Sequence, residues 1–179
     1  ITPDHIDRHG SFENYITAKK KIWHNMGEND YLIICVDNEI TRRIYEEIKG
    51  EAKFKIIPIS SSAITPTLPH NPYLLGDHNR ENMLAATAVA KIMGLSDEEI
   101  SARIKTFIGL KHRMQFIRNY QNIDFYNDSK ATNAESASKS LAALDNIYWL
   151  AGGVAKEGGI ESLISLFPKI KKAYLFGQA

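Results

Sequence analysis

Apolar positions repeat at helical spacing near the start of the chain. In residues 12–26 they recur mostly every three or four positions, and Lys19 lies on the same stripe. This period predicts an amphipathic helix over 12–26 with one face turned toward a core. Short apolar runs follow at 31–37 and 54–60, and a helical pattern at 41–49 separates them. A strand, a helix and a strand in this order predict a parallel βαβ unit.

The middle of the chain is predicted to be mainly helical. Residues 61–77 contain three prolines and are expected to form a loop. A strong helical period covers 79–95. Ser96 and Glu99 then form a capping box, which predicts that a second helix begins directly after Ser96. Residues 109–113, GLKHR, are interpreted as a linker between two domains.

Strand-like runs follow the linker. Two of them flank Gln121-Asn122, which predicts a β-hairpin. A helix, a buried strand, a second helix and a second strand are then predicted at 134–144, 147–153, 159–167 and 173–177. This order is typical of the start of a Rossmann-like domain. The whole pattern therefore predicts an α/β protein.

Composition narrows the classes of partner and compartment. The chain has 179 residues, of which 44% are hydrophobic, so it can form a folded core in one or two domains. A formal net charge of +1 argues against nucleic acid as the main partner. No apolar run approaches the roughly 20 residues of a membrane span, so no membrane insertion is expected. A single cysteine, Cys35, excludes a disulfide framework and favours a reducing cytoplasm.

The densest run of polar groups is FYNDSKATNAES, residues 125–136, between a predicted strand and a predicted helix. Loops in this position carry ligand-binding groups in α/β folds. Asp128 could accept from a ribose hydroxyl, Lys130 could contact a phosphate or carboxylate, and Thr132 could bind an anion near a helix start. The alternative is a capped turn, with Thr132 or Asn133 as the N-cap.

Two further groups have plausible chemistry. Asn79 and Asn82 lie one helical turn apart, and carboxamides match the donor and acceptor edge of a base such as adenine. The alternative is that Asn79 caps the helix. His5, Asp7 and His9 alternate along the chain and could contribute to a Mg²⁺ or a zinc site. Solvent-exposed histidines are an equally open alternative.

Two lysines are also candidates. Partial burial on the apolar stripe would favour a neutral amine at Lys19. A neutral amine can react with carbon dioxide to give a carbamate, which is an oxygen ligand for Mg²⁺. The alternative is that Lys19 extends its ammonium to solvent. Lys156 lies in the glycine-rich turn at 151–159 and could hold a carboxylate, although a tight turn alone would explain the glycines. No Walker A spacing occurs in the chain.

Together these segments resemble the Mur ligases of bacterial cell-wall synthesis, in particular the branch that adds D-glutamate. The matching segments occur in the family's order: DHIDRH, YITAKKKIW, HNRENMLAA, GLKHR, YNDSKATN and LAGGVAK. The run NDSKATN is the most specific of them. The resemblance implies the latter part of a P-loop-type, ATP-binding central domain at 1–110. It also implies the first part of a Rossmann-like C-terminal domain at 111–179. Both chain ends then suggest a piece of a larger protein, without its UDP-binding domain and Walker A loop.

The resemblance also implies roles for individual residues. His5 would bind a second Mg²⁺, and Lys19 would be carbamylated beside that ion. Asn79 and Asn82 would contact adenine, while Arg113 and Asp128 would contact the phosphate and ribose of ATP. The D-glutamate pocket would contain Lys130, Thr132 and Lys156, and Tyr15 and His112 would line the site.

The implied function is ATP-dependent amide formation in the bacterial cytoplasm by a monomeric full-length enzyme. ATP would phosphorylate the alanine carboxylate of UDP-N-acetylmuramoyl-L-alanine, and D-glutamate would attack the acyl phosphate. One alternative is another Mur-type or folylpolyglutamate-type amide ligase. The other is a nucleotide-binding fragment without catalysis, which the missing Walker A loop favours. The isolated chain is expected to make no product.

Overall fold

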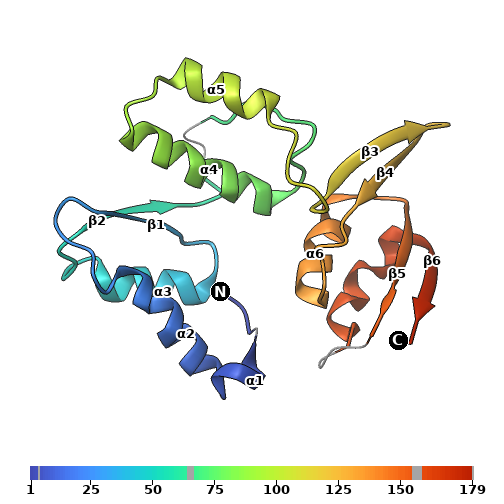
Figure 1. Ribbon diagram of the computed structural model, residues 1–179, viewed down its shortest axis with the longest axis horizontal. Helices are drawn as coiled ribbons and strands as arrows, with labels where there is room; N and C mark the ends of the chain where they lie inside the picture. The colour runs from blue at the N-terminus through green and yellow to red at the C-terminus, as the bar shows by residue number, and fades with distance from the viewer. Residues whose placement is uncertain (4, 64–66, 155–158, 179) are drawn as a thin grey trace. The chain divides into compact units, whose positions relative to one another are not determined.

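The computed structural model describes residues 1–3, 5–63, 67–154 and 159–178. They form two compact units, coloured by residue number in Figure 1. The first unit comprises residues 1–68 and 81–100, and the second comprises 69–80 and 101–179. Each unit combines helices with short strands, which confirms the predicted α/β class.

The first unit contains the predicted parallel βαβ unit. Strand β1 (Tyr31–Cys35) pairs in parallel with β2 (Lys55–Ile59), and α3 (Glu39–Ile48) connects them. The side-chain oxygen of Asn38 accepts hydrogen bonds from the backbone N–H groups of Ile40 and Thr41, at 3.0 and 3.3 Å. Asn38 therefore caps α3, which begins two residues before the predicted start.

The predicted helix at 12–26 is shorter than expected. A four-residue turn, α1 (Ile6–His9), precedes α2 (Phe12–Lys20), and a 3₁₀ turn, η1 (Lys21–Trp23), follows it. The change of period rotates Ile22 out of the apolar stripe, and its side chain is 71% exposed. Trp23 packs against the core instead.

The core of the first unit is small. Ile16 from α2, Ile34 from β1 and Ile44 from α3 are buried against one another. Partly buried side chains surround them: Ile1, Phe12, Trp23, Val36, Ile40, Tyr45, Ile48 and Ile56. Helices α2 and α3 are thus held to the sheet by β-branched residues at their apolar positions.

Two further helices follow, α4 (Asp77–Ile92) and α5 (Asp97–Thr106). The predicted capping box at α5 is present. The backbone N–H of Glu99 donates to Ser96 Oγ at 3.2 Å, and the N–H of Ser96 donates to Glu99 Oε2 at 2.9 Å. None of the helices in the described ranges is long and apolar enough to cross a membrane.

The second unit starts with the predicted hairpin. Strand β3 (Gln115–Tyr120) pairs antiparallel with β4 (Ile123–Asn127). Gln121 and Asn122 have φ values of 51° and 60°. Two consecutive residues with positive φ make the tight turn that matches the twist of the two strands.

A second parallel pair completes this unit. Helix α6 (Ala134–Ala143) precedes β5 (Ile147–Gly153), and β5 pairs with β6 (Ile170–Gly177). The connection η2 (Glu161–Lys169) is a 3₁₀ helix rather than the predicted α-helix, and Pro168 removes one backbone donor from it. Gly152 is required where the strands meet, because a Cβ there would overlap the carbonyl of Phe176.

Candidate functional site

The loop between β4 and α6 contains the polar run that the sequence singles out. Asn127 Oδ1 accepts from the N–H of Ser129 at 3.1 Å, so a side chain closes the first turn of this loop. Asn133 Oδ1 accepts from the N–H of Ser136 at 2.8 Å, which makes Asn133 the N-cap of α6. The capping alternative therefore holds for Asn133. Thr132 lies before the cap and is exposed.

Asp128 connects three segments of the second unit. Its Oδ1 accepts from the backbone N–H of Met114 at 2.9 Å. Its Oδ2 accepts from the hydroxyl of Ser140 on α6. Both carboxylate oxygens are thus occupied in holding the loop against the linker and the helix.

The linker and the loop are joined by further contacts. The N–H of Lys130 donates to the carbonyl of His112 at 2.9 Å, and the His112 ring nitrogen Nδ1 lies 3.1 Å from Asn127 Nδ2. His112 and Met114 have φ values of 66° and 44°. These left-handed conformations reverse the chain beside the loop.

The structure therefore brings several predicted residues into one neighbourhood: His112, Arg113, Asp128, Lys130 and Thr132. The side chains of Arg113, Lys130 and Thr132 are exposed. Neither Arg113 nor Lys130 forms an ion pair with another described residue. The guanidinium group of Arg113 and the ammonium group of Lys130 are thus exposed beside a capped helix start. Such a pair is suited to an anionic ligand such as a phosphate or a carboxylate.

His78, at the start of α4, lies close enough to the loop for the charges there to act on its pKa. Burial lowers the pKa of His78 below its ordinary value of 6.5, and the positive charges of Lys139 and Arg113 lower it further. The negative charges of Asp128 and Asp77 act in the opposite direction. The lowered pKa therefore favours a neutral imidazole at His78, in surroundings that contain both cationic and anionic groups.

Asn79 and Asn82 lie in different surroundings on α4. Asn79 is buried, and its Nδ2 donates to the carbonyl of Leu75 at 2.8 Å. It is not the N-cap, because α4 already begins at Asp77. Asn82 is exposed one turn later. The amide donor of Asn79 is thus used locally, whereas that of Asn82 faces solvent.

Lys19 and His5 are both exposed in the first unit. The Lys19 ammonium lies 5.0 Å from the centroid of the Tyr15 ring, where it makes a cation–π contact. Of the two alternatives for Lys19, the structure therefore shows the one in which its ammonium extends to solvent. Lys20 Nζ instead bonds Glu47 Oε2 at 2.5 Å.

The Mg²⁺ site at His5 and Lys19 stays a prediction. Magnesium takes mainly oxygen ligands, so Lys19 would bind it as the predicted carbamate rather than as an amine. Among the described residues, His5 belongs to no group of three His, Cys, Asp or Glu side chains with metal-binding spacing. Lys156 lies outside the described residues.

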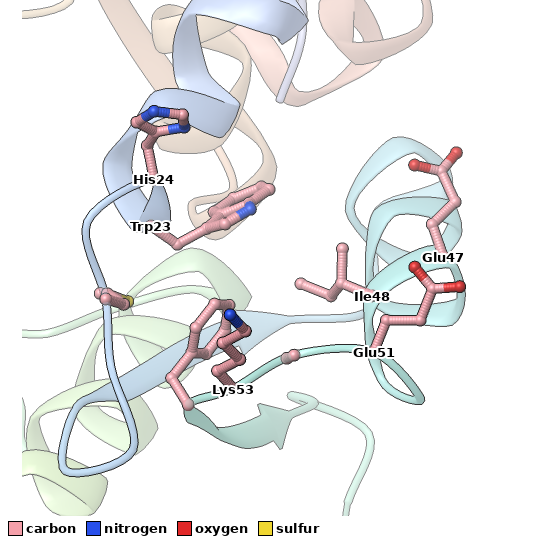
Figure 2. A pocket seen from close by; sticks show the side chains of 9 residues that line it. Trp23, His24, Glu47, Ile48, Glu51 and Lys53 are labelled. Carbon is pink, nitrogen blue, oxygen red and sulfur yellow. The ribbon is translucent and has the colours of Figure 1, made fainter.

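A cavity of about 380 Å³ lies elsewhere in the first unit (Figure 2). Its walls come from the end of η1, the end of α3 and the turn before β2, and they include Trp23, Ile48 and Lys53. These segments precede β1 and β2, so the cavity lies at the amino-terminal end of the sheet. None of the predicted site residues lines it.

The sequence missed Ser140 and His78 as neighbours of the loop. Ser140 lies 12 residues beyond Asp128, and His78 lies in a different helix. Neither spacing has a local pattern that would indicate the contact. The packing of α6 beside the loop brings Ser140 to Asp128, and the start of α4 places His78 where the charge of Asp128 acts on it.

Comparison with known proteins identifies the family. Residues 1–64 match the Mur ligase middle domain. The whole chain is 48% identical, over 196 aligned residues, to the UDP-N-acetylmuramoylalanine--D-glutamate ligase of Rickettsia prowazekii. It is 38% identical over 201 residues to the protein of the same name in Phenylobacterium zucineum. The chain spans 44% and 43% of the length of these two relatives.

The fold is also similar to that of a solved structure at lower identity. A crystal structure of MurF from Acinetobacter baumannii matches 97% of the chain with a TM-score of 0.70 and 19% sequence identity. The match covers 49% of that structure. The fold therefore agrees with the domain match and with the two relatives. On the domain match and the identity to these relatives, the chain belongs to the Mur ligase family.

Proposed function

We propose that this chain is part of a ligase that joins D-glutamate to UDP-N-acetylmuramoyl-L-alanine with ATP. The observation that carries the proposal is the loop NDSKATN, which is fixed between the linker and α6 with Lys130 and Thr132 exposed. The names of the relatives from R. prowazekii and P. zucineum support the same substrates. The absence of a membrane-spanning helix among the described residues agrees with a cytoplasmic enzyme.

We assign the two parts of the chain to two domains of this enzyme. Residues 1–110 would be the latter part of the ATP-binding central domain, and 111–179 the first part of the C-terminal domain. The match of 1–64 to the middle domain supports the first assignment. The parallel pair β5 and β6, with α6 before it, supports the second.

The reaction requires anionic groups to approach one another. The γ-phosphoryl group of ATP moves to the alanine carboxylate, the amine of D-glutamate attacks the resulting acyl phosphate, and inorganic phosphate leaves. Arg113 would offset charge on the ATP phosphates, and Lys130 with Thr132 would hold the D-glutamate carboxylates. Lys156 would join them in the longer protein.

Asp128 has a positioning role in this proposal. Its two oxygens accept from Met114, which follows Arg113, and from Ser140 on α6, so it ties the linker and the helix to the loop that contains Lys130. Contact with a ribose hydroxyl would use a remaining lone pair of the same carboxylate. Asn82, with Asn79 behind it, would contact the adenine edge. His5 and Lys19 would contribute to an ion site that residues outside this chain complete.

A chimera tests the proposal. The aligned segment of the R. prowazekii ligase is replaced by this chain, and ATP-dependent addition of radiolabelled D-glutamate is measured. We expect activity in the chimera. The variant Lys130→Ala should lower kcat/KM for D-glutamate by at least tenfold, since a charge-assisted hydrogen bond contributes about 1.5–3 kcal/mol.

Lys172→Ala is the matched control. Lys172 is an exposed lysine on β6, and its ammonium lies 4.9 Å from the centroid of the Tyr174 ring. Its loss should leave kcat/KM within twofold of the parent chimera. Equal losses for both lysines, or full activity in Lys130→Ala, would contradict the assigned role.

A further inference from the structure

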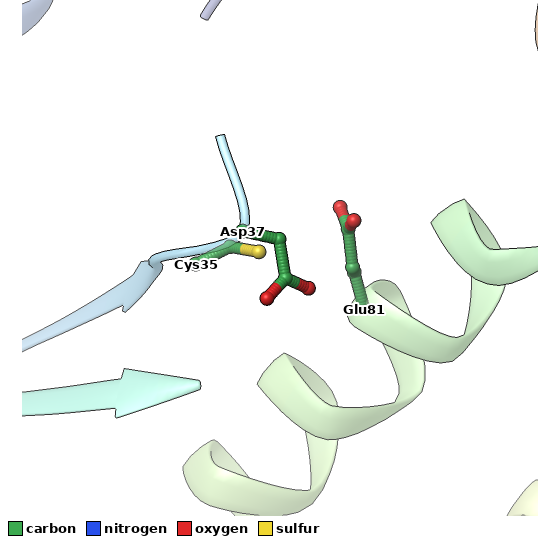
Figure 3. Close-up of side chains that lie close together, drawn as sticks. All are labelled: Cys35, Asp37 and Glu81. Atoms are coloured by element: carbon green, nitrogen blue, oxygen red, sulfur yellow. The ribbon is translucent and has the colours of Figure 1, made fainter. Parts of the chain in front are cut away.

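Three side chains with metal-binding atoms converge in the first unit, apart from the loop described above. Cys35 ends β1, Asp37 follows it by two residues, and Glu81 lies on α4. The Cys35 sulfur and one carboxylate oxygen from each acid all lie within 4.8 Å of one another. All three residues are half-buried. Figure 3 shows the thiol and the two carboxylates grouped together.

The two carboxylates are not neutralised by the protein around them. Asp37 Oδ2 accepts from the N–H and the hydroxyl of Ser61, at 2.6 and 2.7 Å, and Oδ1 accepts from Ser60. These donors are uncharged. No ion pair among the described residues includes Asp37 or Glu81, and the Glu81 side chain has no hydrogen-bond partner in the same ranges. Two half-buried carboxylates this close repel each other unless a cation lies between them.

We propose that Cys35, Asp37 and Glu81 bind a divalent cation of the zinc class. Zinc–sulfur and zinc–oxygen bonds are about 2.3 and 2.0–2.2 Å long, so two ligand atoms on a tetrahedral ion lie roughly 3.4–3.6 Å apart. The three atoms lie within 4.8 Å of one another, so binding would draw them together by up to about 1 Å through side-chain rotation. A tetrahedral ion would keep its fourth position for water or another ligand.

The sulfur atom determines which ions fit. Thiolate ligands favour zinc and similar softer ions, whereas Mg²⁺ takes oxygen ligands and dehydrates reluctantly. On binding, the Cys35 S–H bond breaks, a metal–sulfur bond forms, and the proton leaves to solvent. The site would thereby join the end of β1 to α4 within the first unit.

Cobalt(II) is a direct probe of this site, because a thiolate–Co²⁺ bond produces a charge-transfer band in the near ultraviolet. The 179-residue chain is freed of metal with a chelator and titrated with CoCl₂. We expect the band to reach its plateau at one equivalent. An equimolar amount of Zn²⁺ should abolish it, whereas a large excess of Mg²⁺ should leave it unchanged.

Variants test each ligand. Cys35→Ser should remove the band, and Glu81→Gln should weaken Co²⁺ binding about tenfold or more, since even partners outside the ligand shell have effects of this size. Glu39→Gln, an exposed acid at the start of α3, is the control and should bind like the parent chain. Circular dichroism checks that each variant is folded. No band in the parent chain, a band that persists in folded Cys35→Ser, or displacement by Mg²⁺ would overturn the proposal.

Discussion

At the scale of single residues, Gly76 shows how one backbone conformation shapes the start of α4. Its φ is +84°, and a Cβ there would lie 3.0 Å from Ala143 Cβ and 3.1 Å from His78 Nδ1. Its carbonyl also accepts from the N–H groups of Asn79 and Arg80. Gly76 thus allows the first turn of α4 to lie close to the end of α6.

Gly76→Ala should lower the free energy of unfolding by about 2–4 kcal/mol. About 1–2 kcal/mol comes from the left-handed conformation, and the rest comes from the tight contacts. Urea denaturation measures the difference. Gly94→Ala separates the two causes, because Gly94 has φ +85° and open space around its Cβ position. A loss in Gly94→Ala as large as that in Gly76→Ala would contradict the steric part.

His78 should make stability depend on pH. Its pKa is lowered in the folded chain, so the unfolded chain takes up a proton first as the pH falls below about 6.5. The contribution of His78 to the free energy of unfolding is therefore fully present above about pH 6.5. It falls as the pH decreases toward the pKa of His78 in the folded chain, and it stays constant below that pKa.

His78→Gln should flatten the part of the stability curve that this residue causes between pH 7 and 5. The measurement is the urea midpoint at half-unit steps of pH. His24→Gln, an exposed histidine in the first unit, should keep the slope. An unchanged slope in His78→Gln would show that other groups cause it.

At the scale of elements, Asn71 fixes the end of α5. Asn71 is buried, its Nδ2 donates to the carbonyls of Ile104 and Phe107 at 2.5 and 2.8 Å, and its Oδ1 accepts from the N–H of Tyr73 at 2.7 Å. The last carbonyls of a helix lack regular partners within it, and the Asn71 amide donates hydrogen bonds at this helix end. The proline-rich loop before α4 is therefore tied to α5 through one amide.

Asn71→Ala should cost about 2–3 kcal/mol of stability, because the three hydrogen bonds of a buried amide would be lost. Thermal denaturation followed by circular dichroism measures it. Asn82→Ala is the control, since Asn82 is exposed on α4 and its loss should change stability by less than about 0.5 kcal/mol. Equal effects of the two variants would show that the Asn71 contacts contribute little.

The elements also show which parts of the fold can be predicted from sequence. The capping box at Ser96 and the turn at Gln121-Asn122 were predicted correctly, because short-range side-chain chemistry determines them. The helical period at 12–26 predicted too long a helix. Whether Ile22 or Trp23 faces the core depends on packing against β1 and α3, which the local pattern does not contain.

In the candidate site, too, the local features were predicted and the contacts between distant segments were not. The loop around Asp128 was predicted from its density of polar groups and its place between a strand and a helix. Its structural contacts to Met114 and Ser140 were not predicted, because they join segments distant in the sequence. The helical stripe left two alternatives open for Lys19, because a lysine on an apolar stripe can be partly buried or can extend to solvent, and its exposure decides between them.

At the scale of the whole molecule, the chain has two units that each contain a two-stranded parallel sheet. Parallel sheets are usually covered on both faces. In β5 and β6, however, Tyr148, Leu150 and Phe176 are 54%, 71% and 60% exposed. The chain also spans less than half of its relatives' length, so the proposed activity belongs to a longer protein.

The isolated 179-residue chain should therefore form no D-glutamate adduct with ATP and UDP-N-acetylmuramoyl-L-alanine. It has no Gly-Lys pair and hence no Walker A lysine to contact the transferred phosphate. The reaction mixture is analysed by mass spectrometry, with the R. prowazekii ligase as the positive control. Product from the isolated chain would contradict the expectation that the reaction needs residues outside this chain.

We propose that the loop NDSKATN selects D-glutamate as the residue that is joined. The most direct test gives the chimera described above ATP, UDP-N-acetylmuramoyl-L-alanine and equal concentrations of D-glutamate, L-glutamate, L-lysine and meso-diaminopimelate. Mass spectrometry with chiral analysis then identifies the residue that is joined. We expect D-glutamate in nearly all of the product. A folded, active chimera that joins another of these amino acids would contradict it.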